Sequence, residues 1–429
     1  MQVLYSNIDK DVYIIPATVE GVCMFYSPLR DISFLLGERL AIELVHYYQD
    51  GVLPKDKTIK NYLEQIEDTS IELKSNSREF DIEDRAVIIL TQKCNLACSY
   101  CYAQHSRTQD ILSLEKIKVV VDYIFSKNNG VKKQFTFIGG GEPLVCWSTL
   151  QSSCEYIIKK SIETGIAYNI GIITNATLLT EEKIKWIAEK KNRVSVSFDV
   201  LPDIQNKQRP FAFKNDNSFD AVDTAIRLLH KYNVVFKTRT TITSDIVERM
   251  PEMVEYVVEK YPFIPTLHLE PVTSTDVDYS VFYPKYVKYF MAAYDLGQQK
   301  GIDVENSMVH SIYHIKNHFC KGELCITPEG LISACHRHSN SNDTNYHKCL
   351  YGEVGESKLV INQEQLDKTI KNRQSYAKNC FDCFAKWHCA GGCFSQDMTF
   401  NAEQRKEYCS YVKNFTRDFL EKQIIKMNV

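Results

Sequence analysis

The feature that most constrains the fold is an alternation of short apolar segments with segments of helical period. Six apolar segments rich in β-branched or aromatic residues start at intervals of roughly 25 to 50 residues, and a helical-period segment follows each of them. Parallel strands need such crossover connections, so the alternation predicts an α/β fold, a partial (β/α)6 barrel. The expected strands are Ala86–Leu90, Phe135–Ile138, Ile170–Ile173, Val194–Phe198, Phe236–Thr240 and Leu267–Glu270, and the expected helices are Leu114–Phe125, Leu150–Ile162, Glu181–Ala188, Asp220–Tyr232, Met250–Tyr261 and Tyr286–Leu296.

Composition sets the class of protein. The chain has 429 residues, 44% hydrophobic and 24% charged, which is enough apolar material for a sizeable core and more length than one domain usually has. The net charge of -3 gives no basic excess, so we expect no nucleic-acid partner. The first ten residues lack a secretory signal, and no apolar run reaches the roughly 18 residues of a spanning helix, so we expect a cytoplasmic protein without membrane contact.

Cysteine is the unusual residue, with 15 in the chain. In a reducing compartment an uneven pattern of this kind favours metal ligation over disulfides. Cys94-x3-Cys98-x2-Cys101 follows the first expected strand, where the chemistry of such barrels gathers. Three thiolates can hold three corners of an iron–sulfur cube and leave one iron open to a cofactor. A zinc site is the alternative, but no histidine within the loop completes the four ligands that structural zinc favours.

With this spacing and the aromatic Tyr102 after it, the chain resembles the radical S-adenosylmethionine (SAM) superfamily. Gly140-Gly141-Glu142-Pro143 looks like the family element that binds the amino group of SAM, since glycines permit close backbone approach and a carboxylate pairs with an ammonium. The alternative is a tight strand-to-helix turn. The resemblance implies SAM and an open [4Fe–4S] cluster as cofactors.

Two further elements resemble the family's Thr-Asn-Gly and Ser-x-Asp-Gly sequences. They are Thr174-Asn175 and Ser197-Phe198-Asp199, but Ala176 and Val200 stand where the family has glycine. The usual His-Asp that follows reads Gln205-Asn206, and the later arginine is kept as Arg209. The cofactor-binding residues implied by the resemblance are Tyr102, Gly140, Gly141, Glu142, Asn175, Ser197 and Arg209.

The C-terminal cysteines resemble the SPASM extension, which carries two auxiliary [4Fe–4S] clusters. By this resemblance one cluster takes Cys320, Cys325, Cys335 and Cys393, and the other takes Cys380, Cys383, Cys389 and Cys409. A pair of zinc ribbons is the alternative. His336 and His338 read as loop residues, because eight thiolates already complete two clusters. The remaining cysteines read as buried apolar residues: Cys23, Cys146, Cys154 and Cys349.

The first 85 residues differ in pattern. Expected strands at Val12–Ile15 and Ile32–Leu36 precede expected helices at Glu38–Tyr48 and Lys57–Ile66. This order resembles the winged-helix element that binds leader peptides in maturases of ribosomal peptides, where an extended leader adds to a sheet edge. The expected domains are residues 1–82 for leader recognition, 83–305 for the radical SAM barrel and 306–429 for the SPASM region.

The resemblance implies a radical SAM oxidoreductase acting on a peptide. Such an enzyme cleaves SAM to a 5′-deoxyadenosyl radical, takes a hydrogen from a precursor peptide with a leader, and installs a C–C or C–S (thioether) cross-link. A flavodoxin or ferredoxin would supply the electron. Glu270, at the end of the sixth strand, is the candidate catalytic residue. Alternatives are an anaerobic sulfatase-maturing enzyme, a small-molecule radical SAM dehydrogenase, and a non-catalytic zinc-binding protein.

Overall fold

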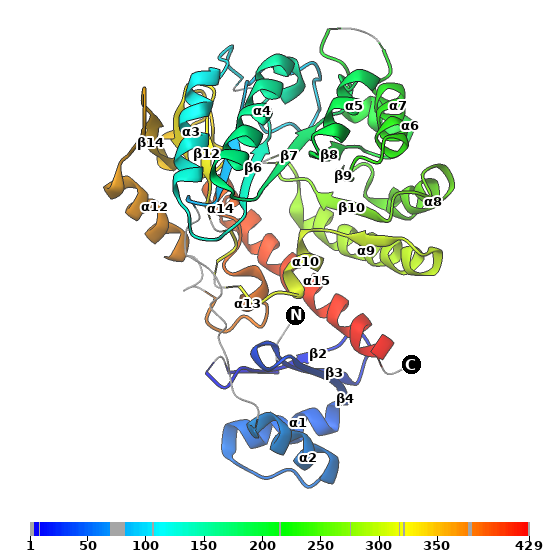
Figure 1. Cartoon of the computed structure of the whole chain (residues 1–429). Coiled ribbons are helices and arrows are strands. Elements are labelled where there is room, and N and C mark those ends of the chain that lie inside the picture. The colour runs from blue at the N-terminus through cyan, green and yellow to red at the C-terminus, as the bar shows by residue number, and fades with distance from the viewer. Residues whose placement is uncertain are drawn as a thin grey trace.

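The computed structural model of the protein describes residues 4–7, 9–68, 82–104, 107–213, 216–274, 276–316, 318–320, 322–375 and 380–427. A large α/β body lies at the top of Figure 1, and a smaller N-terminal lobe lies below it. The long C-terminal helix α15 (Ala402–Met427) runs from the body to this lobe. The domain boundary expected at residue 82 comes directly after residues 69–81, which lie outside the described residues.

The N-terminal lobe is a four-stranded antiparallel sheet followed by two helices. Its strands pair in sequence order, and the helices lie on the side of the sheet away from the body (Figure 1). The two strands and two helices expected from the sequence are confirmed, and the three-residue strand β1 and the six-residue strand β3 were missed. The elements are β1 (Tyr5–Asn7), β2 (Val12–Pro16), β3 (Val22–Ser27), the 3-10 turn η1 (Pro28–Arg30), β4 (Ile32–Gly37), α1 (Glu38–Asp50) and α2 (Lys57–Asp68).

Both faces of the N-terminal sheet are apolar. Since side chains alternate between the two faces along a strand, neighbouring residues belong to different cores. Val12 and Phe25 pack with α1 and α2 in a small separate core. Tyr13 and Tyr26 instead belong to the main core of the body. The buried Tyr26 hydroxyl forms a short hydrogen bond with Nε2 of His388, which lies in the cysteine-rich region. The lobe is therefore packed firmly against the C-terminal part of the chain.

The body contains a curved sheet of seven parallel strands among the described residues, in the order β11 to β5. Helices connect successive strands and cover the outer face (Figure 1). All six expected strands and helices are confirmed, and β11 was missed. The strands are β5 (Arg85–Ile88), β6 (Lys133–Phe137), β7 (Tyr168–Thr174), β8 (Arg193–Ser197), β9 (Phe236–Ile242), β10 (Thr266–Pro271) and β11 (Asp303–Glu305). The helices are α3 (Leu114–Ser126), η2 (Pro143–Cys146), α4 (Trp147–Thr164), α5 (Glu181–Glu189), α6 (Pro202–Gln208), α7 (Ser218–Lys231), η3 (Val247–Arg249), α8 (Met250–Lys260) and α9 (Tyr279–Lys300).

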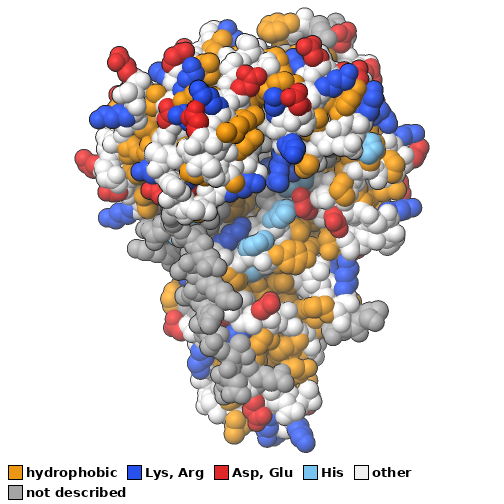
Figure 2. Space-filling view, viewed as in Figure 1, with side chains coloured by type: hydrophobic (Ala, Val, Ile, Leu, Met, Phe, Trp, Pro, Cys, Tyr) orange, Lys and Arg blue, Asp and Glu red, His pale blue; other side chains and the backbone are white. Residues whose placement is uncertain are grey.

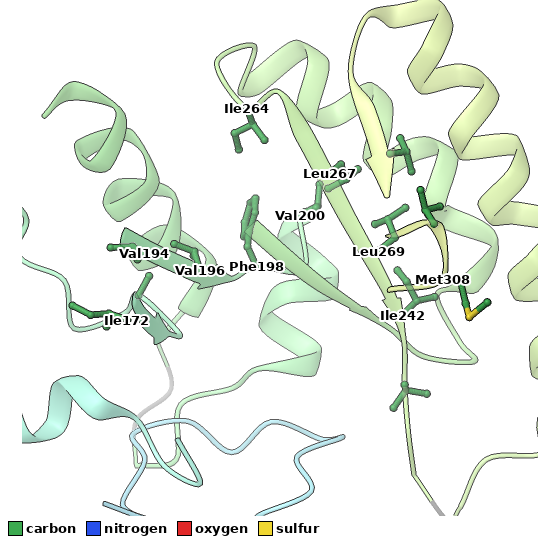
Figure 3. Packing of buried hydrophobic residues seen from close by; sticks show 14 of the residues in the cluster. Ile172, Val194, Val196, Phe198, Val200, Ile242, Ile264, Leu267, Leu269 and Met308 are labelled. Atoms are coloured by element: carbon green, nitrogen blue, oxygen red, sulfur yellow. The ribbon is translucent and has the colours of Figure 1, made fainter. Parts of the chain in front are cut away.

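The core of the body lies between the sheet and its helices. Figure 3 shows Ile172, Val196, Leu267 and Leu269 among the buried side chains that fill this space. Side chains at alternate positions of the same strands face the inside of the barrel, as the two-residue period requires. This places the polar residues at the strand ends around an interior space.

The C-terminal region continues the same sheet. Strand β12 pairs in parallel with β5, and three antiparallel strands extend the sheet beyond β12. The sequence did not predict this continuity. The elements are α10 (Ser307–Ile312), β12 (Leu324–Ile326), β13 (Leu331–Ser333), α11 (Tyr346–Cys349), β14 (Leu350–Val354), β15 (Leu359–Ile361), α12 (Gln363–Ser375), α13 (Lys386–Cys389) and α14 (Phe394–Thr399).

Among the described residues, no helix combines the length and the apolar character that crossing a membrane requires.

We predict that Tyr26→Phe destabilises the protein by about 1 to 3 kcal/mol. The substitution leaves the Nε2 atom of His388 buried without its partner, and an unsatisfied buried polar atom costs that much. Denaturant unfolding of the purified protein measures the change. Tyr62→Phe, at an exposed tyrosine of α2, is the control and should change stability by less than about 0.5 kcal/mol. Equal stability of the two variants would contradict the proposed contribution of the His388 contact.

Candidate functional site

A cavity of about 530 Å³ lies at the carboxyl ends of the barrel strands. On the face shown in Figure 2, the surface is hollowed below the barrel, and Lys, Arg and His side chains gather around the hollow. Ligand sites of α/β barrels occupy this end of the sheet. The structure brings all the cofactor-binding residues expected from the sequence to the wall of the cavity, together with the candidate catalytic residue: Tyr102, Gly140, Gly141, Glu142, Asn175, Ser197, Arg209 and Glu270.

Cys94, Cys98 and Cys101 line one side of this cavity. The backbone N–H of Leu96 lies 3.5 Å from Sγ of Cys94, and the Arg107 guanidinium lies 3.5 Å from Sγ of Cys101. Burial raises the pKa of the Cys98 thiol to about 12 and also raises that of Cys94. A raised pKa disfavours the thiolate form of Cys94 and Cys98, and an iron cluster would supply the positive charge that stabilises it.

The glycine loop after β6 packs directly against the segment that leads into Cys94. Gly141 N donates to Thr91 O at 3.2 Å, and Glu142 N donates to Lys93 O at 2.8 Å. A Cβ atom on Gly141 would lie 2.0 Å from Lys93 O, which is a backbone atom that cannot give way without moving the loop. Tyr102 adds a second tie, because its hydroxyl donates to Gly139 O at 2.9 Å. Glycine is therefore required here for close backbone approach.

The carboxylate of Glu142 is buried and already hydrogen-bonded. It accepts from Thr174 Oγ1 at 2.6 Å, from the backbone N–H of Asn175 at 2.8 Å and from that of Leu144 at 3.1 Å. Burial raises the pKa of this carboxyl to about 7, although the three donors lower it. Glu142 joins the ends of β6 and β7, and its contact with a SAM ammonium stays a prediction.

Arg209 is engaged with Asp199 in a buried ion pair. Its Nε lies 2.9 Å and its Nη2 3.1 Å from the two carboxylate oxygens. The same carboxylate accepts from the Tyr100 hydroxyl at 2.9 Å and from Gln208 Nε2 at 2.9 Å. Arg209 also lies over the Tyr100 ring, 5.2 Å from its centre. Arg209 thus supports the cysteine loop that contains Tyr100, and Ser197 beside this pair faces the cavity.

Ala176 and Val200 replace glycines of the family pattern, yet both keep a left-handed backbone. Their φ angles are +63° and +64°, a region that side chains with a Cβ rarely adopt. Both are fully buried, so packing compensates for the unfavourable conformation. The turns after β7 and β8 therefore keep the backbone course that glycine would favour.

The other predicted cysteine ligands gather in two further groups. Burial raises the pKa of the Cys325, Cys335 and Cys393 thiols, and the charge of a neighbouring thiol raises it further: Cys335 for Cys325, Cys393 for Cys335, and Cys320 for Cys393. Burial likewise raises the pKa of Cys380, Cys383 and Cys389, and Cys409 is among the neighbouring thiols whose charge adds to this effect. The neighbours agree with the two sets that the resemblance implies, whose role as cluster ligands stays a prediction, and no disulfide joins any of the cysteines in the described part of the chain.

Two details of the first auxiliary set were not expected. Cys393 lines the central cavity, so this set borders the same space as Cys94, Cys98 and Cys101. Cys349, which the sequence analysis assigned to apolar packing, is fully buried and coupled to both Cys325 and Cys335. It adds a fifth thiol beside this set.

His336 is a cavity residue that sequence reasoning missed. Its ring lines the cavity, and its Nδ1 lies 3.0 and 2.9 Å from the two carboxylate oxygens of Glu323. Burial raises the pKa of the Glu323 carboxyl, but the positive charge of His336 and the hydrogen bonds that His336 donates lower this pKa to about 2. The carboxylate therefore stays ionised, and it orients the His336 ring. The only sequence signal was its position directly after Cys335. His338 is buried and forms hydrogen bonds with Asp343 and Ser395, which is typical of a structural residue.

Glu270 lies across the cavity from the cysteine loop, at the end of β10. Its Oε2 accepts from the Ser307 hydroxyl at 2.8 Å and lies 2.8 Å from Nε2 of His268 and 3.6 Å from Nη2 of Arg239. Burial raises its pKa, but the hydrogen bond to His268 and the Arg239 charge lower it overall, so the carboxylate is ionised at neutral pH. A proton-accepting role for Glu270 stays a prediction.

These residues together define a class of protein. A partial α/β barrel whose strand ends carry three thiols, a glycine loop and a 530 Å³ cavity is suited to hold an iron–sulfur cluster beside a cofactor. Residues 88–257 match the family model described as the Radical SAM superfamily. This part of the chain is therefore a radical SAM domain, and such a domain implies SAM and a [4Fe–4S] cluster as cofactors.

Two curated relatives show how far the likeness extends. An uncharacterised protein of Methanocaldococcus jannaschii is 30% identical over 172 residues, which are 40% of this chain, and the match spans only 57% of that relative. The cysteine-type anaerobic sulfatase-maturating enzyme of Clostridium perfringens is 24% identical over 354 residues, which cover 75% of this chain and 92% of that enzyme.

Two solved structures match the fold. The structure of anSMEcpe with bound AdoMet and the Kp18Cys peptide has a TM-score of 0.67 at 21% identity and covers 80% of this chain and 99% of that chain. Streptococcus suis SuiB bound to its precursor peptide SuiA has a TM-score of 0.53 at 14% identity and covers 92% of this chain and 97% of that chain. At these identities the likeness establishes the fold alone.

We predict that Gly141→Ala displaces the cysteine loop and lowers the iron content of the anaerobically reconstituted protein. The added Cβ meets the Lys93 carbonyl, so the Lys93–Cys94 segment must shift. Gly171→Ala is the control, because a Cβ there meets nothing within 4 Å. Iron analysis should show lower iron per chain for Gly141→Ala, with the control equal to the natural sequence. Full iron in both variants would mean that the loop tolerates the shift.

Proposed function

We propose that this protein is a radical SAM maturase that oxidises a ribosomal precursor peptide and installs a C–C or thioether cross-link. One observation carries the proposal. The cavity is bordered by Cys94, Cys98 and Cys101 on one side and by Cys393 of an auxiliary set on another. A substrate in this cavity lies between a site that removes a hydrogen atom and a site that can take up an electron. Residues 1–82, 83–305 and 306–429 then serve for leader binding, radical chemistry and electron transfer.

The residues fit three [4Fe–4S] clusters. The three thiols at the cavity leave one iron for SAM, and each auxiliary set offers four thiols. When bound, the first cluster and SAM supply the 5′-deoxyadenosyl radical that takes a hydrogen atom from the substrate. Tyr102, the glycine loop and the Asp199–Arg209 pair hold the cysteine loop and the cavity wall in place.

Forming a cross-link removes two hydrogens from the peptide. One leaves as a hydrogen atom, and the other leaves as a proton plus an electron, which a cluster held by the auxiliary cysteines would take up. The imidazole of His336 in its neutral form and the carboxylate of Glu270 are two cavity groups able to take up that proton. Aromatic side chains on the same wall exclude water from the reacting centre, among them Tyr283, Tyr408 and Tyr411.

The N-terminal lobe supplies the leader-binding surface in this proposal. Strand β4 is an edge strand of the lobe, and Phe34 on it stacks against Tyr62 of α2 with ring centres 4.6 Å apart. Tyr62 is 38% exposed. A peptide that adds to the edge of β4 would place side chains against this aromatic pair. SuiB, whose match covers 92% of this chain, is described with its precursor peptide bound.

Anaerobic sulfatase maturation is the second candidate. It is favoured by the match to the Clostridium perfringens sulfatase-maturating enzyme, which spans 92% of that relative. That reaction oxidises a Cys or Ser side chain to formylglycine. Leader binding by the N-terminal lobe distinguishes the two candidate functions, because only the maturase needs a bound leader.

The deciding experiment follows peptide mass after incubation of the reconstituted enzyme with SAM and dithionite. We expect a precursor with its leader to lose two hydrogens, and the same core peptide without the leader to react at least about tenfold more slowly. Tyr62→Ala should reduce this advantage, whereas Ile162→Ala, at an exposed residue of α4, should not. Oxidation of a short peptide bearing one Cys or Ser, with no effect of a leader, would instead establish sulfatase-type maturation.

We predict that His336→Ala lowers peptide oxidation by about 10²-fold or more while SAM cleavage continues. The reason is that the variant removes a positioned proton acceptor from the cavity and leaves the three SAM-cluster cysteines in place. Product quantification beside 5′-deoxyadenosine release measures the two steps separately. His347→Ala, at an exposed histidine, is the matched control. Parallel loss of both products would assign His336 to cofactor binding instead.

A further inference from the structure

A second group of possible metal ligands lies at the edge of the barrel, apart from all the cysteine sites. His268 on β10, Glu305 on β11 and His310 on α10 each offer a ligand atom, and these atoms all lie within 4.8 Å of one another. His268 and Glu305 are direct partners in the parallel ladder. Leu267 and Leu269, which flank His268, point into the apolar core in Figure 3, so His268 and Glu270 share the opposite face of β10.

The distances are those of groups that can share one ion. Nδ1 of His268 lies 3.3 Å from Oε1 of Glu305, and Nε2 of His310 lies 2.9 Å from Oε2 of the same carboxylate. Neighbouring ligands around a tetrahedral zinc are separated by similar distances, because zinc–nitrogen and zinc–oxygen bonds are about 2.0 to 2.2 Å long. Two histidines and one glutamate with a free position form a common zinc set.

The other nitrogen of His268 has the partner that metal-binding histidines usually have. Its Nε2 lies 2.8 Å from Oε2 of Glu270. A carboxylate that accepts a hydrogen bond from one ring nitrogen leaves the second nitrogen free to coordinate, and it makes that nitrogen more basic. Glu270, His268 and the space between His268 and Glu305 thus follow one another in the order of a carboxylate–histidine–metal arrangement.

Charge and access also suit a divalent ion. Glu270 and Glu305 bring two carboxylates to this corner, and Arg239, 3.6 Å from Glu270, is the nearby cation from β9. The His268 side chain is 10% exposed, Glu305 22% and His310 59%, so an ion can enter from solvent and water can complete its coordination. Binding would displace the hydrogens that His268 Nδ1 and His310 Nε2 direct at Glu305, so that both ring nitrogens become available to the ion.

We propose that His268, Glu305 and His310 bind a divalent transition-metal ion of the zinc type, with Glu270 as the carboxylate that orients His268. The ion would join β10, β11 and α10. It would also hold Glu270 at the cavity wall through His268. This site is independent of the iron–sulfur clusters and of the identity of the peptide substrate.

The test uses the full-length, anaerobically reconstituted protein dialysed against zinc chloride, with zinc and iron measured per chain. We expect about one more zinc per chain in the natural sequence than in His310→Ala, with equal iron in both. His46→Ala is the matched control, because His46 is an exposed histidine 3.3 Å from Asp50, and the described residues place no third ligand beside this pair. This control should keep the additional zinc.

Two further variants complete the test. Glu305→Gln keeps the size of the side chain and should also lose the additional zinc. This variant tests the proposal if His310→Ala fails to retain its clusters. Glu270→Gln should weaken zinc binding by about 10- to 100-fold, as expected for loss of the carboxylate that orients a ligand histidine. Equal zinc in the natural sequence and in Glu305→Gln, at equal iron, would overturn the proposal and leave the group as an ion-pair network.

Discussion

The buried carboxylate of Asp199 is the interaction on which the rest of the site depends. It lies at the end of β8 and is paired with Arg209, Tyr100 and Gln208, while its Oδ1 also accepts the backbone N–H of Thr241 at the end of β9. A fully buried carboxylate is stable only when such partners compensate for its lost hydration. Because Tyr100 lies between Cys98 and Cys101, this charge anchors the cysteine loop to two barrel strands.

A second constraint acts from the opposite side of the cysteine loop. The glycine loop after β6 touches the backbone of Thr91 and Lys93, and Glu142 ties that loop to the end of β7. The cavity wall is thus made of backbone contacts and buried polar bonds between neighbouring strand ends. Such a wall is rigid, which is what positioning of a reactive cofactor requires.

The continuity of the sheet explains why the auxiliary cysteines approach the cavity. Cys325 lies on β12, which pairs with β5, the strand that leads into Cys94. Cys335 and His336 follow from β13, so the turn after this strand carries a thiol of the auxiliary set and an imidazole that lines the cavity. The cysteine-rich region is therefore built onto the barrel, and its thiols are within the same structural unit as the radical site.

The division of the other cysteines into two ligand sets rests on the family resemblance and stays a prediction, whereas the sequence by itself determined the six strand–helix units and the position of Cys94, Cys98 and Cys101 at a strand end. These features are local, because period and spacing report on neighbours along the chain. The backbone conformation of the turns at Ala176 and Val200 did not follow from the sequence, since residue type alone does not reveal a left-handed backbone that packing stabilises. Only the tertiary structure decided that β12 extends the barrel sheet, that His336 reaches the cavity beside Glu323, and that His268, Glu305 and His310 meet. Each of these depends on contacts between segments distant in sequence or on the pairing of neighbouring strands, which the chain's local pattern does not encode.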